Sequence, residues 1–197
     1  MSQEFDKFCY DLYYGDLEIN KFEKWVYESS KLESLISSDQ YLELISLNYQ
    51  SRDIKHQIEK ILKNHIDYGY LEKKRIIEQL NKSLQSREAL PQILQWFYYM
   101  YCHGYYFLFD IGIGYGLTCV VPPSKYKVET WEELNQEEKD QIIESFYPQI
   151  ESDIYRALSW IKEDKIVLTG TKDDMNRWEF IDNRTDEEKI STILKES

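Results

Sequence analysis

The segment from Gln95 to Pro123 constrains the fold more than any other part of this chain. Its 29 residues read QWFYYMYCHGYYFLFDIGIGYGLTCVVPP, with six tyrosines and a single formal charge, Asp110. The segment exceeds the roughly 20 apolar residues that a membrane-spanning helix needs. However, a central aspartate costs about 2.5–3.5 kcal/mol in that setting, and the three alternate glycines that follow it weaken a continuous helix. We therefore expect residues 91–123 to form a central apolar core, not a membrane span.

Two conformations fit residues 104–116 of this segment. In the first, a buried helix ends at Gly112 with a left-handed cap, and a short strand follows in GLTCVV, residues 116–121. In the second, the chain after Gly104 is extended, and every second side chain lies on one apolar face. We favour the helix followed by the strand, because the extended alternative is longer than one usual strand.

The sequence GIGYG, residues 112–116, resembles a phosphate-binding loop only superficially. A dinucleotide fingerprint has GxGxxG between a strand and the helix whose N-terminus meets the phosphate. Here the spacing is GxGxG, and two prolines close the LTCVVPP that follows. The motif does not indicate a nucleotide site, and we expect no cofactor.

The rest of the chain predicts helices and one hairpin. Residues 1–90 carry narrow apolar stripes at helical spacing, and residues 124–197 combine acidic helices with the β-rich runs KIVLTG and RWEFID around a polar turn. Only 7 Gly and 4 Pro occur, which favours helices over a many-stranded fold. The predicted fold is mainly α, a multi-helix single domain over residues 1–197 with a small C-terminal β-hairpin.

Several helix starts carry capping signals. In the first half, Asp39 is a predicted N-cap, and either Ser51 or Asp53 is another. Three capping boxes are predicted further along, the last of them opening a helix through Ile190, Ile193 and Leu194. These boxes are Thr130–Glu133, Asn135–Glu138 and Thr185–Glu188.

The most regular helical stripe runs from Ile150 to Ile161. Its apolar residues recur at three- and four-residue spacing, so one side of the helix is predicted to face the core. On this helix, Glu151, Asp153 and Arg156 fall on the side predicted to face solvent.

The net charge of −12 is unevenly distributed. Residues 129–197 hold 19 acids and 9 bases, a net charge of −10, so most of the negative field belongs to the last third. This sign opposes binding to nucleic-acid phosphates and anionic lipids, and it attracts a basic protein. We expect a basic protein partner, no nucleic acid and no membrane.

The residues that carry catalytic or metal chemistry are dispersed. Cys9, Cys102 and Cys119 contain no CxxC pair, and the three histidines lie on separate predicted elements, so neither a disulfide framework nor a metal site is expected. Asp110 is the residue to examine, since burial among apolar side chains raises the pKa of an unpaired carboxyl group. In the non-catalytic interpretation, Asp110 caps a turn or bonds a tyrosine hydroxyl such as Tyr115. No catalytic residue is assigned.

The acidic last third is the predicted partner-binding surface, with aromatic side chains such as Trp131 as anchors. The predicted contact residues are Glu132, Glu133, Glu137, Glu138, Asp140, Glu144, Asp173, Asp174 and Trp178.

The segment FEKWVYESSKLESLISSDQYLELISLNYQ, residues 22–50, resembles the N-terminal helices of small acidic bacterial immunity proteins, which accompany secreted toxins. The resemblance lies in its short, aromatic-rich helices. It implies tight inhibition of a protein partner, and it assigns no functional residue.

Together these patterns predict a non-enzymatic, cytoplasmic protein-binding domain, in its most concrete form an immunity or antitoxin protein. The N-terminus, MSQEFDKF, lacks the basic and apolar pattern of a signal peptide. Two alternatives stay open: a small hydrolase or transferase that uses Asp110 with a His or Cys brought near by the fold, and a self-associating structural protein.

Overall fold

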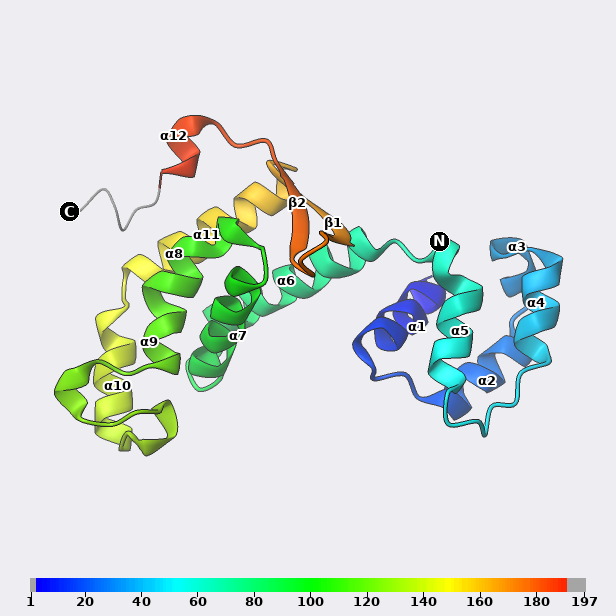
Figure 1. The fold of residues 1–197 in the computed structure, drawn as a ribbon, viewed down its shortest axis with the longest axis horizontal. Coiled ribbons are helices and arrows are strands. Elements are labelled where there is room, and N and C mark those ends of the chain that lie inside the picture. Colours follow the sequence, from blue (N-terminus) through cyan, green and yellow to red (C-terminus); the bar gives the residue numbers. More distant parts are fainter. Residues whose placement is uncertain (1–2, 191–197) are drawn as a thin grey trace. The chain divides into compact units, whose positions relative to one another are not determined.

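A computed structural model describes residues 3–190 of the chain, apart from the side chain of Gln3 (Figure 1). The described chain is mostly helical, with a two-stranded antiparallel sheet near its C-terminal end. This confirms the predicted fold class. Within the described residues the chain divides between Asp67 and Tyr68 into two compact units, and each is described by itself. The single domain over residues 1–197 stays a prediction.

The first unit is a set of short helices around an aromatic core. Phe5, Phe22 and Trp25 are buried there, and Phe8 packs against both Phe22 and Trp25. Its elements are α1 (Gln3–Tyr14), α2 (Ile19–Glu28), α3 (Leu32–Leu35), α4 (Ser38–Ile45), α5 (Ile54–Leu62) and the 3-10 turn η1 (Lys63–His65).

The N-cap predicted at Asp39 is wrong. Helix α4 begins one residue earlier, and Ser37 and Gln40 form a reciprocal capping box in which each side chain accepts from the other's backbone N–H. Asp53 is the N-cap residue of α5, but its side chain does not bond the helix backbone and instead accepts from the Ser51 hydroxyl.

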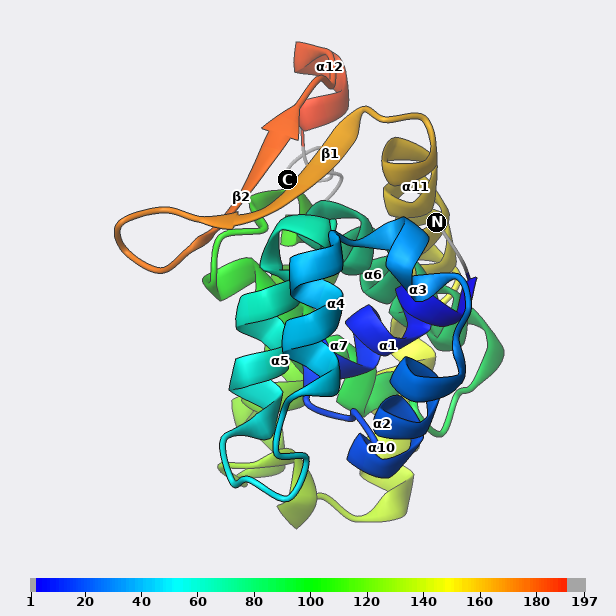
Figure 2. The same ribbon diagram turned by 90° about the vertical axis from the view of Figure 1, so that its right-hand side faces the viewer.

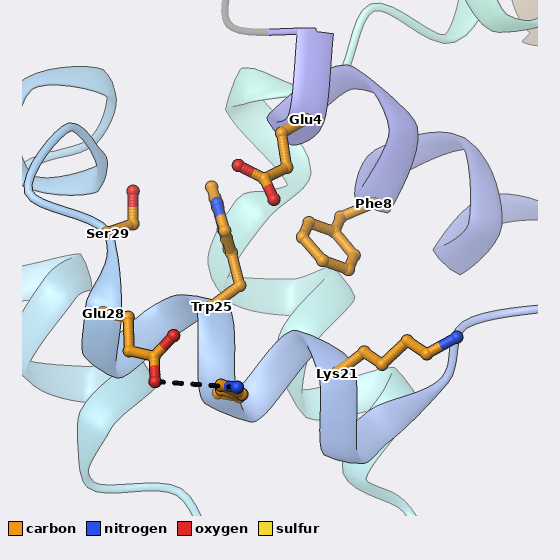
Figure 3. Close-up of a pocket in the computed structure, with 7 residues that line it drawn as sticks. Glu4, Phe8, Lys21, Trp25, Glu28 and Ser29 are labelled. Carbon is orange, nitrogen blue, oxygen red and sulfur yellow. Dashed lines mark ion pairs between the residues drawn. The ribbon is translucent and has the colours of Figure 1, made fainter.

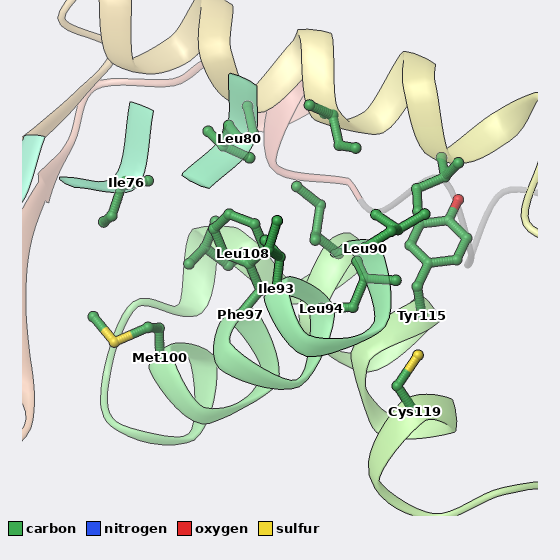
Figure 4. Packing of buried hydrophobic residues seen from close by; sticks show 14 of the residues in the cluster. Ile76, Leu80, Leu90, Ile93, Leu94, Phe97, Met100, Leu108, Tyr115 and Cys119 are labelled. Atoms are coloured by element: carbon green, nitrogen blue, oxygen red, sulfur yellow. The ribbon is translucent and has the colours of Figure 1, made fainter. Parts of the chain in front are cut away.

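The second unit holds the apolar segment, the acidic helices and the hairpin. Its helices pack around one core that includes Leu80, Leu94, Phe97 and Leu108 (Figure 4). Its elements are α6 (Tyr68–Gln85), α7 (Leu90–Cys102), η2 (Tyr106–Leu108), α8 (Phe109–Ile111), η3 (Gly112–Gly116), α9 (Leu117–Val120), η4 (Ser124–Tyr126), η5 (Trp131–Glu133), α10 (Gln136–Ser145), α11 (Gln149–Lys162), β1 (Ile166–Lys172), β2 (Trp178–Asp182) and α12 (Asp186–Lys189).

The apolar segment is helical almost throughout. After α7 the chain turns at Gly104, whose φ is +119°, and then continues as a helix through η2, α8, η3 and α9. The strand predicted in GLTCVV is wrong, and so is the extended alternative. Gly112 is not a left-handed cap either, since its φ of −71° lies in the right-handed helical region.

One helical stretch, Tyr106–Tyr126, is long and apolar enough to cross a membrane by length and composition alone. Half of its most apolar window is buried inside the protein, as in a core helix. Phe107, Leu108 and Ile111 supply part of that burial within the core of the second unit.

The glycines of GIGYG allow this helix to approach α7 closely. A Cβ atom at Gly116 would lie 2.3 Å from the carbonyl oxygen of Leu94, and one at Gly112 would lie 3.0 Å from that of Phe97. These two residues are four apart, so they share one helix face. The motif is a contact between two helices, and η3 itself is a single π-helical stretch.

The predicted hairpin is confirmed. Figure 2 shows β1 and β2 side by side, with their turn at one end and α12 beyond the other. Ile166 pairs with Asp182 and Leu168 with Phe180, and the register shifts before Lys172.

Two of the three predicted capping boxes are present. Asn135 with Glu138 opens α10, and Thr185 with Glu188 opens α12. At Thr130 the hydroxyl donates to Glu133 and does not accept from the helix backbone, so this box is wrong. The continuation predicted through Ile193 and Leu194 lies outside the described residues.

Candidate protein-binding surface

Asp110 belongs to a buried ion-pair cluster. Its carboxylate accepts a 2.6 Å hydrogen bond from Nη2 of Arg156, and the same nitrogen donates to Asp153 over 2.8 Å. Asp110 lies on α8 and the other two on α11, so the arginine joins the two helices. The hydroxyl of Tyr115 bonds Asp153 over 2.5 Å, where the sequence had suggested Asp110 as its partner.

Asp153 is the residue whose position was predicted wrongly. It was assigned to the solvent side of its helix, but it is only 2 % exposed. Gln149 and Tyr115 donate to its carboxylate in addition to Arg156, so the buried charge is well satisfied. Burial and, after it, the bond to Asp153 raise the pKa of Tyr115. The cluster therefore holds α8, η3 and α11 together, which is a structural role.

A pocket of about 330 Å³ lies beside Asp110, with aromatic walls that include Phe109 and Trp160. Neither His nor Cys is among the residues that line it. His103 is occupied elsewhere, stacked on Tyr99 at a centroid distance of 3.9 Å. The described residues of this pocket thus bring neither a His nor a Cys to Asp110. Within residues 3–190 no group of three or more His, Cys, Asp or Glu is placed to hold a metal ion.

The three cysteines should differ sharply in reactivity. Burial raises the pKa of Cys9 and of Cys119 to about 12, whereas Cys102 is exposed. Because the thiolate is the reactive form, we expect iodoacetamide at pH 8 to modify Cys102 rapidly and the other two only on unfolding. Mass spectrometry of the alkylated peptides measures this, and rapid labelling of Cys119 in the native protein would contradict the packing described above.

The predicted acidic contact residues separate into two groups. Six lie on η5 and α10, and Asp173, Asp174 and Trp178 lie at the hairpin. Figures 1 and 2 place α10 and the turn of the hairpin apart, so the nine residues do not form one surface.

The hairpin group is largely engaged within the fold. Asp173 pairs with Arg177 at 2.7 Å, and this bond lowers the pKa of the aspartate. Trp178 is half-buried and stacks on Tyr105 at 5.8 Å, with the Lys172 ammonium over its ring. Of this group, only Asp174 is exposed.

The α10 group contains the acids that face solvent. The Glu138 carboxylate accepts from the backbone N–H of Asn135, and Glu133 accepts from the Thr130 hydroxyl and from the backbone N–H of Glu129. All of these acids except the partly buried Glu138 are exposed, and three of them lie on one side of α10, where they border an open depression beside Arg87. The exposed acids are Glu132, Glu133, Glu137, Asp140 and Glu144.

A groove of about 380 Å³ adjoins this acidic side of α10. Trp131, Pro91 and Ile143 supply apolar surface, and Asp140 borders both the groove and the depression. Sequence reasoning named Trp131 as an aromatic anchor, and the structure places it 8 % exposed at this groove. Arg87 and Glu88, in the connection between α6 and α7, also line the groove. The sequence did not indicate this, because they lie more than forty residues from α10.

The charges around the groove favour a cation. Arg87 forms an ion pair with Glu144, so these two opposite charges cancel each other. The other charged residues at the groove and the depression are three acids, Glu88, Glu137 and Asp140, and one base, Lys139. The surface thus combines an apolar floor with an excess of carboxylates at its edge, a combination suited to a lysine- or arginine-bearing partner.

Comparison of the chain with protein-family models, with curated proteins and with solved structures finds no match.

Proposed function

We propose that this chain is a non-enzymatic binding protein that captures a basic protein through the acidic side of α10 and its adjoining groove. The observation that carries the proposal is the apolar floor formed by Trp131, Pro91 and Ile143 directly beside exposed carboxylates. Apolar anchors supply most of the affinity at such interfaces, and charges around them steer association and select the partner.

The more specific form of this proposal is an immunity role. The short, aromatic-rich helices of residues 22–50 resemble those of immunity proteins. Such proteins inhibit by binding, which requires no catalytic group. The pairing of Asp110 with Arg156 supports a binding function over the hydrolase or transferase alternative, because the carboxylate is held by a cation in place of a His or Cys.

Neutralising three acids of the α10 group, of which Glu137 and Asp140 border the depression, is expected to weaken binding about tenfold at low salt. In the variant E132Q/E137Q/D140N, the loss of each exposed charge is expected to reduce the binding free energy by about 0.3–1 kcal/mol. The protein encoded by the adjacent reading frame is the partner to test, with affinity measured by calorimetry at 50 and 500 mM salt. The difference between variant and parent should shrink at the higher salt, where charges are screened.

The matched control is E151Q/E163Q/E187Q, which removes the same charge from exposed positions elsewhere in the second unit. It should bind like the parent protein. Equal weakening by both triple variants would show that net charge alone matters and would refute the α10 surface. If the neighbouring protein does not bind at 50 mM salt, and co-expression with it does not restore growth, the immunity role fails.

A further inference from the structure

A second pocket, in the first unit, lies between α1 and α2. It encloses about 440 Å³ and was not anticipated from the sequence. Figure 3 shows it from close by, with the side chains of α1 above those of α2. The residues that line it are Glu4, Phe8, Lys21, Lys24, Trp25, Glu28 and Ser29.

The aromatic wall of this pocket is rigidly held. Trp25 packs against Phe5, Phe8 and Phe22, with ring centroids 6.0, 4.9 and 5.8 Å away. Trp25 is 8 % exposed, and Phe8 is half-buried beside it. These aromatic side chains are therefore already ordered before a ligand binds. Binding does not have to immobilise them, so its entropic cost is lower.

The pocket lining carries two carboxylates, Glu4 and Glu28, and two ammonium groups, one of which pairs with an acid outside the lining. The Lys21 ammonium pairs with Glu18 at 2.7 Å, and Figure 3 shows it directed away from Trp25. Lys24 and Glu28 are 3.9 Å apart and both well exposed, so their attraction is weak. Glu4 points toward Trp25 in the same view.

We propose that this pocket binds an arginine side chain presented by a basic peptide segment. A guanidinium group stacks on aromatic rings and bonds carboxylates with its planar donors at the same time, whereas an ammonium group is compact and more strongly hydrated. Phe8 and Trp25 provide the rings, and Glu4 and Glu28 provide the acceptors. The site is independent of the α10 surface, which belongs to the other unit.

An arginine peptide and its uncharged isostere test this assignment. The probes are two eight-residue Gly/Ser peptides with blocked ends, one with a single central arginine and one with citrulline at that position. The full-length protein is labelled with ¹⁵N at its tryptophan indoles, and the W25F variant identifies the Trp25 signal. We expect the arginine peptide to shift that signal saturably and the citrulline peptide to bind at least tenfold more weakly.

The variant E4Q/E28Q should weaken arginine binding by about tenfold, because both acceptors lose their charge. E33Q/E43Q is the control, since it makes the same charge change at exposed positions of the first unit that do not line the pocket. Thermal unfolding of each variant checks that the fold is kept. Equal binding of arginine and citrulline, or a shift of the Trp131 signal without one of Trp25, would overturn the proposal. The α10 variant E132Q/E137Q/D140N should leave the Trp25 response unchanged, so the two sites fail or succeed separately.

Discussion

Replacing Arg156 with leucine is expected to lower the free energy of unfolding by about 3–5 kcal/mol. The substitution leaves Asp110 and Asp153 buried without the cation that both of them bond, at 8 % and 2 % exposure. A buried carboxylate that loses its cation keeps its desolvation cost without the attraction of an opposite charge, even where neutral donors still bond it. Urea denaturation monitored by circular dichroism measures the loss.

Arg87→Leu is the matched control for this prediction. Arg87 also pairs with a carboxylate, that of Glu144, but the two side chains are 55 % and 69 % exposed. Exposed pairs typically contribute less than about 1 kcal/mol, so this variant should unfold close to the parent. If R156L costs no more than R87L, the cluster around Arg156 is not a structural brace.

The same cluster shows where sequence reasoning reaches its limit. The periodicity of α11 correctly predicted the helix and its apolar stripe. Asp153 was assigned to the solvent side because charged residues on a helix are expected to face solvent. The periodicity contains no information about which residues of other elements pack beside the helix. Asp153 is buried because Tyr115 and Arg156 supply its hydrogen bonds, and Tyr115 is thirty-eight residues away.

Much of the apolar segment lies in the core of the second unit, and the helix expected over its first part is present, but the conformation from Gly112 onward was misjudged. Its lack of charge was sufficient to place it in the core, since composition alone determines that preference. Glycine and β-branched residues favoured a break and a strand by local propensity. Tertiary packing overrides that propensity, because Gly112 and Gly116 let the helix lie close against α7.

The hairpin and the acidic helix were predictable for a related reason. Alternation in RWEFID and the capping pair Asn135–Glu138 are signals contained within a few residues. The grooves were not predictable, because each is formed by elements that meet only in the folded chain. Glu4 and Glu28, for example, come to the same pocket from α1 and α2.

Replacing Gly116 with alanine is expected to lower the free energy of unfolding by about 2–3 kcal/mol. The new Cβ atom would lie 2.3 Å from the carbonyl oxygen of Leu94 and 2.9 Å from Cβ of Tyr98. A backbone oxygen cannot move aside as a flexible side chain can, so the two helices must separate and the core between them loses contacts. Urea denaturation measures the loss.

Gly114→Ala separates this packing effect from helix propensity. Gly114 is two positions from both Gly112 and Gly116, so on a helix it lies on a different face from the pair that contacts α7. Alanine there should be neutral or slightly stabilising, because alanine favours a helix by up to about 1 kcal/mol over glycine. A loss in G114A equal to that in G116A would mean that flexibility of GIGYG, not close approach to α7, is what the glycines provide. A loss confined to G116A would identify the GxGxG pattern of this chain as a helix-contact motif.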